Sequence, residues 1–294
     1  MVDPPLKAMS TVRLEKGGGI ISKLDLDKIV LEGILRIGGG CRGLFIKGDS
    51  RNGRTKKNID RFLSFSRKQF ESISSIQLLK PTDYPIFKRI LYVGIIDTLS
   101  KTVYPTRKEN RKRFTSFIKN FSNWKYCEKV SLPHLIRVLE RTPDPEFSDL
   151  SKFAYSRFDA WAQGEIIELD KDPDYTEVQK LWPKHKEHFK PIENVQLDFL
   201  QHANLLYTYR NLLIHEMRKP GYGIDLGNPK EPFYHSMTHV ENVTNTWELV
   251  YPVIFFESLC KTVLEELEKY YINNRIDPYH LFTFGTFWIA ELNR

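Results

Sequence analysis

The feature of this sequence that most constrains its fold is the spacing of its apolar residues. In the segment 107–124, Phe114, Phe117, Phe121 and Trp124 follow one another at intervals of three, four and three. Such intervals place side chains on one face of an α-helix, whereas a half-buried strand requires alternation. Prolines separate the periodic segments from one another. The pattern predicts an all-α fold, a bundle of antiparallel helices joined by longer loops.

The same reasoning extends along the chain. Helices are expected at 58–79, 84–104, 107–124, 130–141, 147–163, 175–188, 196–217 and 240–273. The Gly- and Pro-rich stretch 218–239 is expected to be a long ordered loop. The most apolar run, 247–267, contains two glutamates and a proline, which indicates a buried helix rather than a membrane span.

The N-terminal part differs in composition from the rest. It contains two triplets of glycine, and residues 1–68 carry 15 Lys and Arg against 7 Asp and Glu, although the whole chain has a net charge of +7. We therefore expect a Gly-rich basic arm at 1–56 and a helical domain at 57–294. The arm suits contact with a polyanion such as RNA, and it equally suits a solvated, disordered tail.

Two nucleotide- or metal-binding patterns are weak. The segment "GDSRNGRT" (48–55) resembles a phosphate-binding loop, but Arg54 stands where a lysine belongs, and the strands that would surround such a loop are missing from the pattern. The pairs His185 with His188 and His235 with His239 are close in sequence but lack a supporting motif. We expect no metal and no cofactor.

The three cysteines, Cys41, Cys127 and Cys260, are far apart and form no CxxC pair. Together with the lack of an apolar signal segment at the N-terminus, this predicts a reduced protein of the cytoplasm.

A run of basic residues marks the segment 107–125. Its cationic side chains include Arg107, Lys108, Arg111, Lys112 and Arg113. A helix face of this kind can follow the phosphates of RNA, and it can equally be a solvated outer face.

The stretch "YTYRNLLIHEMRKPGYG" (207–223) places three polar residues among apolar ones: Arg210, Asn211 and His215. Asn211 and His215 are four residues apart and share a helix face, and the long side chain of Arg210 is expected to reach the same pocket. An imidazole can move protons between a ribose hydroxyl and a leaving oxygen, and a guanidinium can stabilise the developing charge. The alternative is a buried arginine paired with a carboxylate and a histidine bonded to the backbone.

The residues from Arg210 to His215 resemble the R-x(4–6)-H motif of the HEPN superfamily (higher eukaryotes and prokaryotes nucleotide-binding), in which a polar residue often follows the arginine. The upstream segments "LYVGIIDTLSKTVY" and "NRKRFTSFIKNF" are also similar to the first helices of bacterial HEPN-like proteins. The resemblance covers about 85–270. It implies a helical bundle that dimerises, with the motifs of two subunits facing each other across one RNA-cleaving cleft.

On this resemblance, Arg210 and His215 are the expected catalytic pair, Asn211 assists them, and Asp97 is an acidic partner that orients Arg210 or His215. The implied function is a metal-independent endoribonuclease, with RNA as substrate, a homodimeric state and an antitoxin or other regulatory protein as partner. A HEPN-like binding module without catalysis and a purely structural helical bundle are the alternatives.

Overall fold

The computed structural model describes residues 12–14, 19–21, 51–76, 85–106, 109–185, 188–225, 229–239 and 244–280. Within them the chain is mostly helical, with a small antiparallel sheet of three strands. The chain divides into two compact units. One comprises residues 1–85 and 271–294, and the other comprises residues 86–270.

The first unit contains the N-terminal strands and one long helix. Strands β1 (Val12–Leu14) and β2 (Gly19–Ile21) pair antiparallel, and α2 spans Arg51–Ser74. The ring of Phe62 on α2 packs edge-on against that of Tyr271, with ring centroids 6.1 Å apart. Asn58 Nδ2 donates a hydrogen bond of 2.6 Å to Asp277 Oδ2. Residues from the two ends of the sequence therefore form this unit together.

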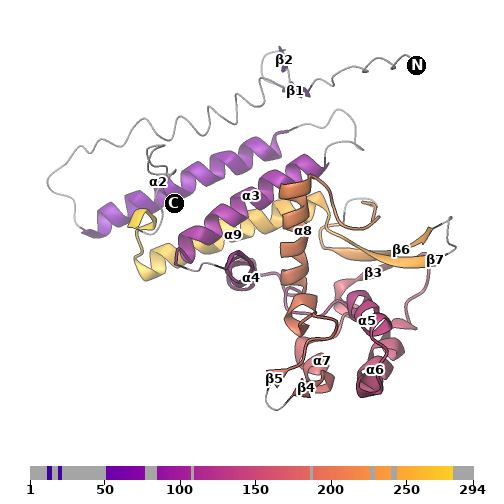
Figure 1. Cartoon of the computed structure of the whole chain (residues 1–294). Helices are drawn as coiled ribbons and strands as arrows, with labels where there is room; N and C mark the ends of the chain where they lie inside the picture. The colour runs from indigo at the N-terminus through magenta and orange to yellow at the C-terminus, as the bar shows by residue number, and fades with distance from the viewer. Residues whose placement is uncertain are drawn as a thin grey trace, which may run out of the picture. The chain divides into compact units, whose positions relative to one another are not determined.

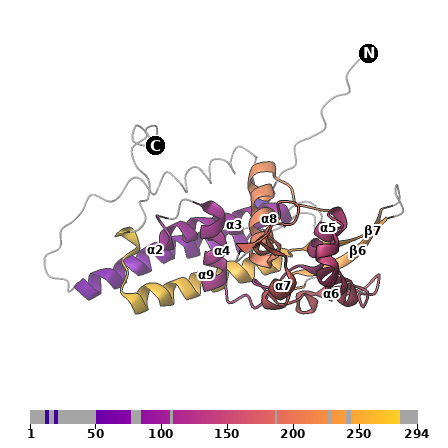
Figure 2. The ribbon, with the colours of Figure 1, turned by 60° about the horizontal axis from the view of Figure 1, so that its bottom comes forward.

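The second unit is built on helices. They are α3 (Pro85–Val103, its first residue in the other unit), α4 (Asn110–Phe121), α5 (Leu132–Arg141), α6 (Ser148–Phe158), α7 (Tyr175–Leu181), α8 (His202–Glu216) and α9 (Val253–Asn274, of which residues up to 270 belong here). Figure 1 shows α8 crossing α3 and α9 steeply, and both views place α5, α6 and α7 toward the N-terminal end of α8 (Figures 1 and 2).

A small sheet accompanies these helices. Its strand order is β3 (Ile166–Glu168), β6 (Phe233–His239) and β7 (Thr244–Val250), with Ile167 opposite Tyr234 and Tyr234 opposite Leu249. A second antiparallel pair joins β4 (Lys184–His185) to β5 (His188–Phe189). Short 3₁₀ turns, including Leu197–Leu200 just before α8, complete the connections.

Aliphatic and aromatic residues of α5, α6, α7 and the following segments form one core cluster. Its fully buried members include Leu135 and Leu139 on α5, Leu150 and Ala154 on α6, and Val178 on α7. The intervals of four within α5 and α6 explain why each helix buries one face against the others.

The structure corrects two expectations. The segment 240–273 is not one helix, because residues 244–250 form β7 and α9 begins at Val253. The expected loop 218–239 likewise ends in a strand, β6. Helix α2 begins at Arg51, so its first residues include Gly53, Arg54 and Thr55 of the phosphate-loop pattern. Because these residues are already helical, they do not form a loop that precedes a helix.

Leu135→Ala tests the core cluster. Leu135 is completely buried, so truncation removes apolar contacts and leaves a cavity, and we expect the free energy of unfolding to fall by about 2–5 kcal/mol. Ile166→Ala is the control, because Ile166 is 50% exposed and its loss should cost about 0.5 kcal/mol or less. Guanidinium denaturation followed by circular dichroism measures both. Equal losses in the two variants would contradict the packing described here.

Candidate functional site on helices α3, α4 and α8

A buried carboxylate, Asp97 on α3, lies at the centre of the candidate site. Arg210 Nη2 on α8 donates a hydrogen bond of 2.9 Å to Asp97 Oδ2, across 113 residues of sequence. Arg113 on α4 places Nη2 3.7 Å from Asp97 Oδ1, and Lys101, one turn further along α3, places Nζ 3.6 Å from Oδ2. We call Asp97, Lys101, Arg113 and Arg210 the Asp97 cluster.

The Asp97 cluster has more positive than negative charge. Asp97, Arg113 and Arg210 are all buried, and Lys101 is about half exposed. Arg113 Nε also donates to Ser100 Oγ at 3.2 Å, whereas Arg210 Nε and Asp97 Oδ1 have no hydrogen-bond partner among the described residues. Buried charges are costly unless they are paired. One carboxylate and three cations therefore leave a local excess of positive charge, which favours the binding of an anion nearby.

Helix geometry separates Arg210 from His215. Arg210 lies on the buried face of α8 together with Ala203, Leu206 and Leu213, at intervals of three and four. His215, five residues after Arg210, is exposed in the last turn. In the described part of the chain, no hydrogen bond joins the two. The expectation that they share one pocket within a chain is therefore wrong.

Asn211 and Asp97 both contact the guanidinium of Arg210. Asn211 Oδ1 accepts a hydrogen bond of 2.8 Å from Arg210 Nη1, so Asn211 contacts the arginine rather than the imidazole. Asp97 is the carboxylate partner of Arg210. For Arg210 the geometry matches the alternative, a buried arginine paired with a carboxylate.

The basic residues of α4 lie in three different environments. Arg113, expected on an RNA-binding face, is buried in the Asp97 cluster. Arg111 is partly buried between the rings of Phe199 and Tyr207, with Cζ 4.7 Å and 4.8 Å from their centroids, and burial lowers the pKa of its guanidinium. Lys112 is exposed and pairs with Glu109 at 3.0 Å. Arg107 and Lys108 lie outside the described residues.

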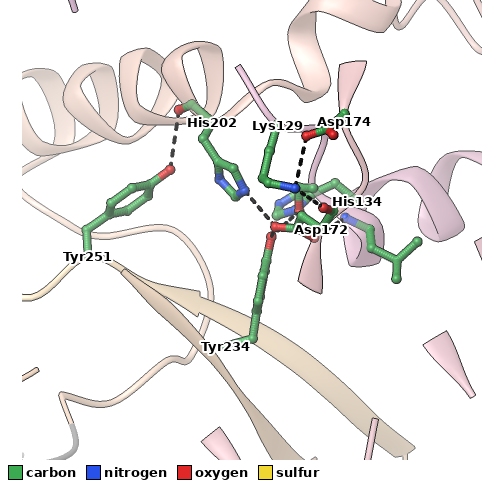
Figure 3. Close-up of polar contacts among 9 residues, drawn as sticks. Lys129, His134, Asp172, Asp174, His202, Tyr234 and Tyr251 are labelled. Atoms are coloured by element: carbon green, nitrogen blue, oxygen red, sulfur yellow. Dashed lines mark hydrogen bonds and ion pairs between the residues drawn. The ribbon is translucent and has the colours of Figure 1, made fainter. Parts of the chain in front are cut away.

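A second polar cluster, shown in Figure 3, was not predicted from the sequence. The carboxylate of Asp172 accepts hydrogen bonds from the Leu132 backbone N–H at 2.8 Å, the Tyr234 hydroxyl at 2.8 Å and His202 Nε2 at 2.7 Å. Ser131 Oγ lies 2.7 Å from the Tyr234 hydroxyl. We call Ser131, Asp172, His202 and Tyr234 the Asp172 cluster. Their sequence positions are too far apart for any local pattern to link them.

The Asp172 cluster is closed to solvent. Ser131, His202 and Tyr234 are completely buried and Asp172 is 1% exposed. The cluster joins the first turn of α5, the first residue of α8 and strand β6. Although it combines a serine, a histidine and an aspartate, its burial leaves a substrate no access to it. We therefore assign it to positioning α5, α8 and β6 rather than to catalysis.

The segment that follows α8 folds back onto the sheet. Met217, in a left-handed conformation (φ 52°), ends the helix. The Tyr222 N–H then donates to Glu248 Oε2 at 3.0 Å, and the Ile224 N–H donates to His235 Nε2 at 2.9 Å. Asp225 pairs with the buried Arg89 of α3. The exposed last turn of α8 therefore lies between two fixed points. One is the contact of Arg210 with Asp97, and the other is the loop after the helix, which is bonded to the sheet and to α3.

The histidine pairs considered as metal ligands gain no support. His235 is buried and accepts the Ile224 N–H, while the side chains of His185, His188 and His239 lie outside the described residues. Across the part of the chain that the structure describes, no group of three His, Cys, Asp or Glu side chains is arranged to hold a metal ion. Over the same residues, no helix has both the length and the apolar character to cross a bilayer.

One surface hollow, with a volume of about 430 Å³, lies away from these clusters. It is lined by the end of α5, the loop that follows and part of α6, including Glu140, Pro143 and Tyr155. None of its lining residues comes from α3, α4 or α8, and we assign it no role in the candidate site.

The comparisons with known proteins leave the family open. No family model, no curated protein and no solved structure matches this chain. The HEPN resemblance therefore stays a prediction that rests on the motif residues themselves.

Asp97→Asn tests the central ion pair. Removing the charge leaves Arg113 and Arg210 buried without a carboxylate, so we expect the free energy of unfolding to fall by about 3–5 kcal/mol. Glu109→Gln, which breaks the exposed pair with Lys112, should change it by about 1 kcal/mol or less. Urea denaturation of both variants makes the comparison. A cost for Asp97→Asn no larger than that for Glu109→Gln would show that the buried pair adds nothing.

His134, beside the Asp172 cluster, gives a pH-dependent prediction. Its Nδ1 lies 2.7 Å from Ser131 Oγ, and burial, followed by the nearby His202, lowers its pKa from 6.5 to about 4. Between these pH values the unfolded chain takes up a proton that the folded chain does not. The stabilisation is therefore complete above pH 6.5 and is lost as pH falls toward 4.

His134→Gln removes this titration. The free energy of unfolding of the wild type should fall by about 1–3 kcal/mol more than that of His134→Gln between pH 7 and pH 4. The control is His280→Gln, because the His280 side chain is 83% exposed and its removal should leave the pH profile unchanged. Identical profiles for the wild type and His134→Gln would contradict the prediction.

Proposed function

We propose that this chain is a HEPN-type endoribonuclease that binds RNA at the outer surface of α3, α4 and α8 and cleaves it without a metal ion. The single observation that carries the proposal is the buried contact between Arg210 and Asp97. It joins the arginine of the R-x(4)-H motif to the carboxylate that the resemblance names as its partner, and it fixes the helix on which His215 lies.

The chemistry assigned to His215 is acid–base catalysis. Its imidazole is exposed in the last turn of α8, so a phosphodiester can approach it. A neutral imidazole can accept the proton of a ribose 2′-hydroxyl, and the protonated form can donate to the leaving 5′-oxygen. The charge excess of the Asp97 cluster supports binding of the phosphate beside this helix.

Arg210 has a positioning role in this proposal. Its Nη2 is bonded to Asp97 and its Nη1 to Asn211, so the guanidinium is held inside one subunit. Direct contact with the RNA phosphate is assigned instead to the more accessible Lys101, Lys112 and Arg111. The proposal further includes a homodimer in which two copies of His215 face one RNA strand, and an antitoxin or other regulatory protein that controls it.

The proposal places the protein in the cytoplasm. Cys127 and Cys260 are free and buried thiols, and burial raises the pKa of Cys127 to about 11. Such thiols are typical of structural residues in a reducing compartment.

A second candidate function is RNA binding by a HEPN-like module without catalysis. The observation that favours it is the burial of Arg210, which directs the guanidinium away from the exposed imidazole of His215. In this case the cationic residues would still bind RNA, but His215 would be dispensable.

His215→Ala separates the two functions. We expect the wild type to cleave RNA in the presence of EDTA and leave a 2′,3′-cyclic phosphate, and His215→Ala to lose at least about a hundredfold in rate because the acid–base group is gone. His280→Ala is the matched control, since His280 is another exposed histidine, and it should retain full activity. Products are resolved on denaturing gels.

The outcomes differ clearly. EDTA-resistant cleavage that survives His215→Ala would refute the role of His215. RNA binding with a steep salt dependence but no cleavage by either protein would select the binding module. Neither binding nor cleavage would refute both functions.

A further inference from the structure

We propose that Phe199 is a stacking platform for an unpaired nucleobase, and that the RNA bound by this chain is therefore single-stranded at this point. The inference deepens the proposed function and rests on it, because it names the form of RNA that the surface takes. Phe199 is not part of the HEPN motif and lies eleven residues before Arg210.

The first argument is the exposure of an aromatic ring in a tightly packed turn. Phe199 belongs to the 3₁₀ turn Leu197–Leu200, and it is 39% exposed, whereas Leu197 and Leu200 in the same turn are buried. Leu197 and Leu200 therefore fix this turn in the core without a contribution from Phe199. Exposing a large aromatic ring to water is unfavourable, and a flat apolar ligand that stacks on the ring would remove its surface from water.

The second argument is the cation held against this ring. Arg111 Cζ lies 4.7 Å from the centroid of Phe199 and 4.8 Å from that of Tyr207. Arg111 Nη1 also donates to Asn204 Oδ1, at 3.4 Å, and Asn204 Nδ2 donates to the Asp198 carbonyl at 2.8 Å. Residues of α4, the 3₁₀ turn and α8 thus build one stack whose outer ring is Phe199.

The third argument is the cation that remains unpaired beside the ring. Lys112 on α4 is exposed but pairs with Glu109 at 3.0 Å, and Lys119, two turns after Arg111, pairs with Glu128 at 3.2 Å. Arg111 forms no ion pair with a carboxylate of the described residues, so its guanidinium is the local positive charge. The neighbouring Asp198 carboxylate is occupied, because Oδ1 accepts a hydrogen bond of 2.6 Å from the Tyr175 hydroxyl. An accessible ring beside cations is the combination that binds single-stranded nucleic acid, through base stacking and phosphate contacts.

A base paired within a duplex cannot stack on Phe199, because both of its faces are covered by neighbouring base pairs. The platform therefore selects unpaired bases in strands, loops or bulges. Stacking involves the face of the base and not the ribose, so a DNA strand of the same sequence should depend on Phe199 in the same way.

The experiment measures binding in a His215→Ala background, in which cleavage is absent. The probe is a fluorescein-labelled RNA of about ten nucleotides, used as a single strand, annealed to its complement, and as the equivalent DNA strand; fluorescence anisotropy gives the dissociation constants. We expect Phe199→Ala to weaken binding of both single strands by about five- to a hundredfold. Duplex binding should remain unchanged, and Phe199→Trp should bind as the parent does.

The matched control is Phe189→Ala. Phe189 is also 39% exposed and also has a cation over its ring, Lys184 at 5.2 Å, but it lies on β5. Because Phe189 is not part of the stack of Arg111, Phe199 and Tyr207, its loss should leave RNA binding intact. Circular dichroism and the melting temperature check that Phe199→Ala folds as the parent does.

Two results would overturn the inference. One is single-strand binding by Phe199→Ala equal to that of the parent, and the other is an equal loss in Phe189→Ala. If the parent binds RNA and the wild type cleaves it through His215 while Phe199→Ala binds normally, the stacking platform is wrong and the proposed function stands. If the parent binds no RNA in any form, both fail.

Discussion

The carboxylate of Asp97 is the constraint on which the rest of the candidate site depends. It brings a cation from α8 and another from α4 onto α3, in a part of the protein from which water is largely excluded. Three helices that are separate in sequence are thereby fixed by one charged group. The cost of burying charge would make this arrangement unfavourable if any partner were missing. The contact therefore also explains why Arg210, within an otherwise apolar face of α8, does not destabilise that helix.

A second buried carboxylate completes the positioning of α8. Asp172 holds the first residue of the helix through His202, while Asp97 holds its middle through Arg210. Between these two contacts the helix has little freedom to rotate about its own axis. The last turn, with His215, is then presented to solvent at a fixed orientation. The loop that follows is anchored by Asp225 on Arg89 and by the Ile224 N–H on His235, so the exposed imidazole has an ordered surrounding on both sides.

The sequence allowed the helices of the fold to be predicted, but not the sheet. Helices α3, α4 and α5 follow from apolar intervals of three and four, with Pro85 in the first turn of α3. Strand β7 was missed because "TNTWELV" leads into the apolar run of α9 without a clear break before Pro252. The link between Asp97 and Arg210 came from the resemblance. Positions five residues apart on a helix differ by about 140° around its axis, which predicts that Arg210 and His215 face different sides. The long arginine side chain does not bridge this difference, because its guanidinium is bound to Asp97. Nothing in the local sequence marks Asp172, because its partners Leu132, His202 and Tyr234 come from three distant segments.

The three consecutive basic residues of α4 show why a charged segment does not by itself define a binding surface. Successive positions on a helix differ by about 100°, so Arg111, Lys112 and Arg113 point in different directions. Arg113 compensates a buried carboxylate, Arg111 packs between two rings, and Lys112 faces solvent. In the proposed function, contact with a polyanion therefore involves fewer residues than the composition of the helix suggests. The proposal adds Lys101 on α3 and Phe199 before α8, from elements that Asp97 and Tyr207 link to α4.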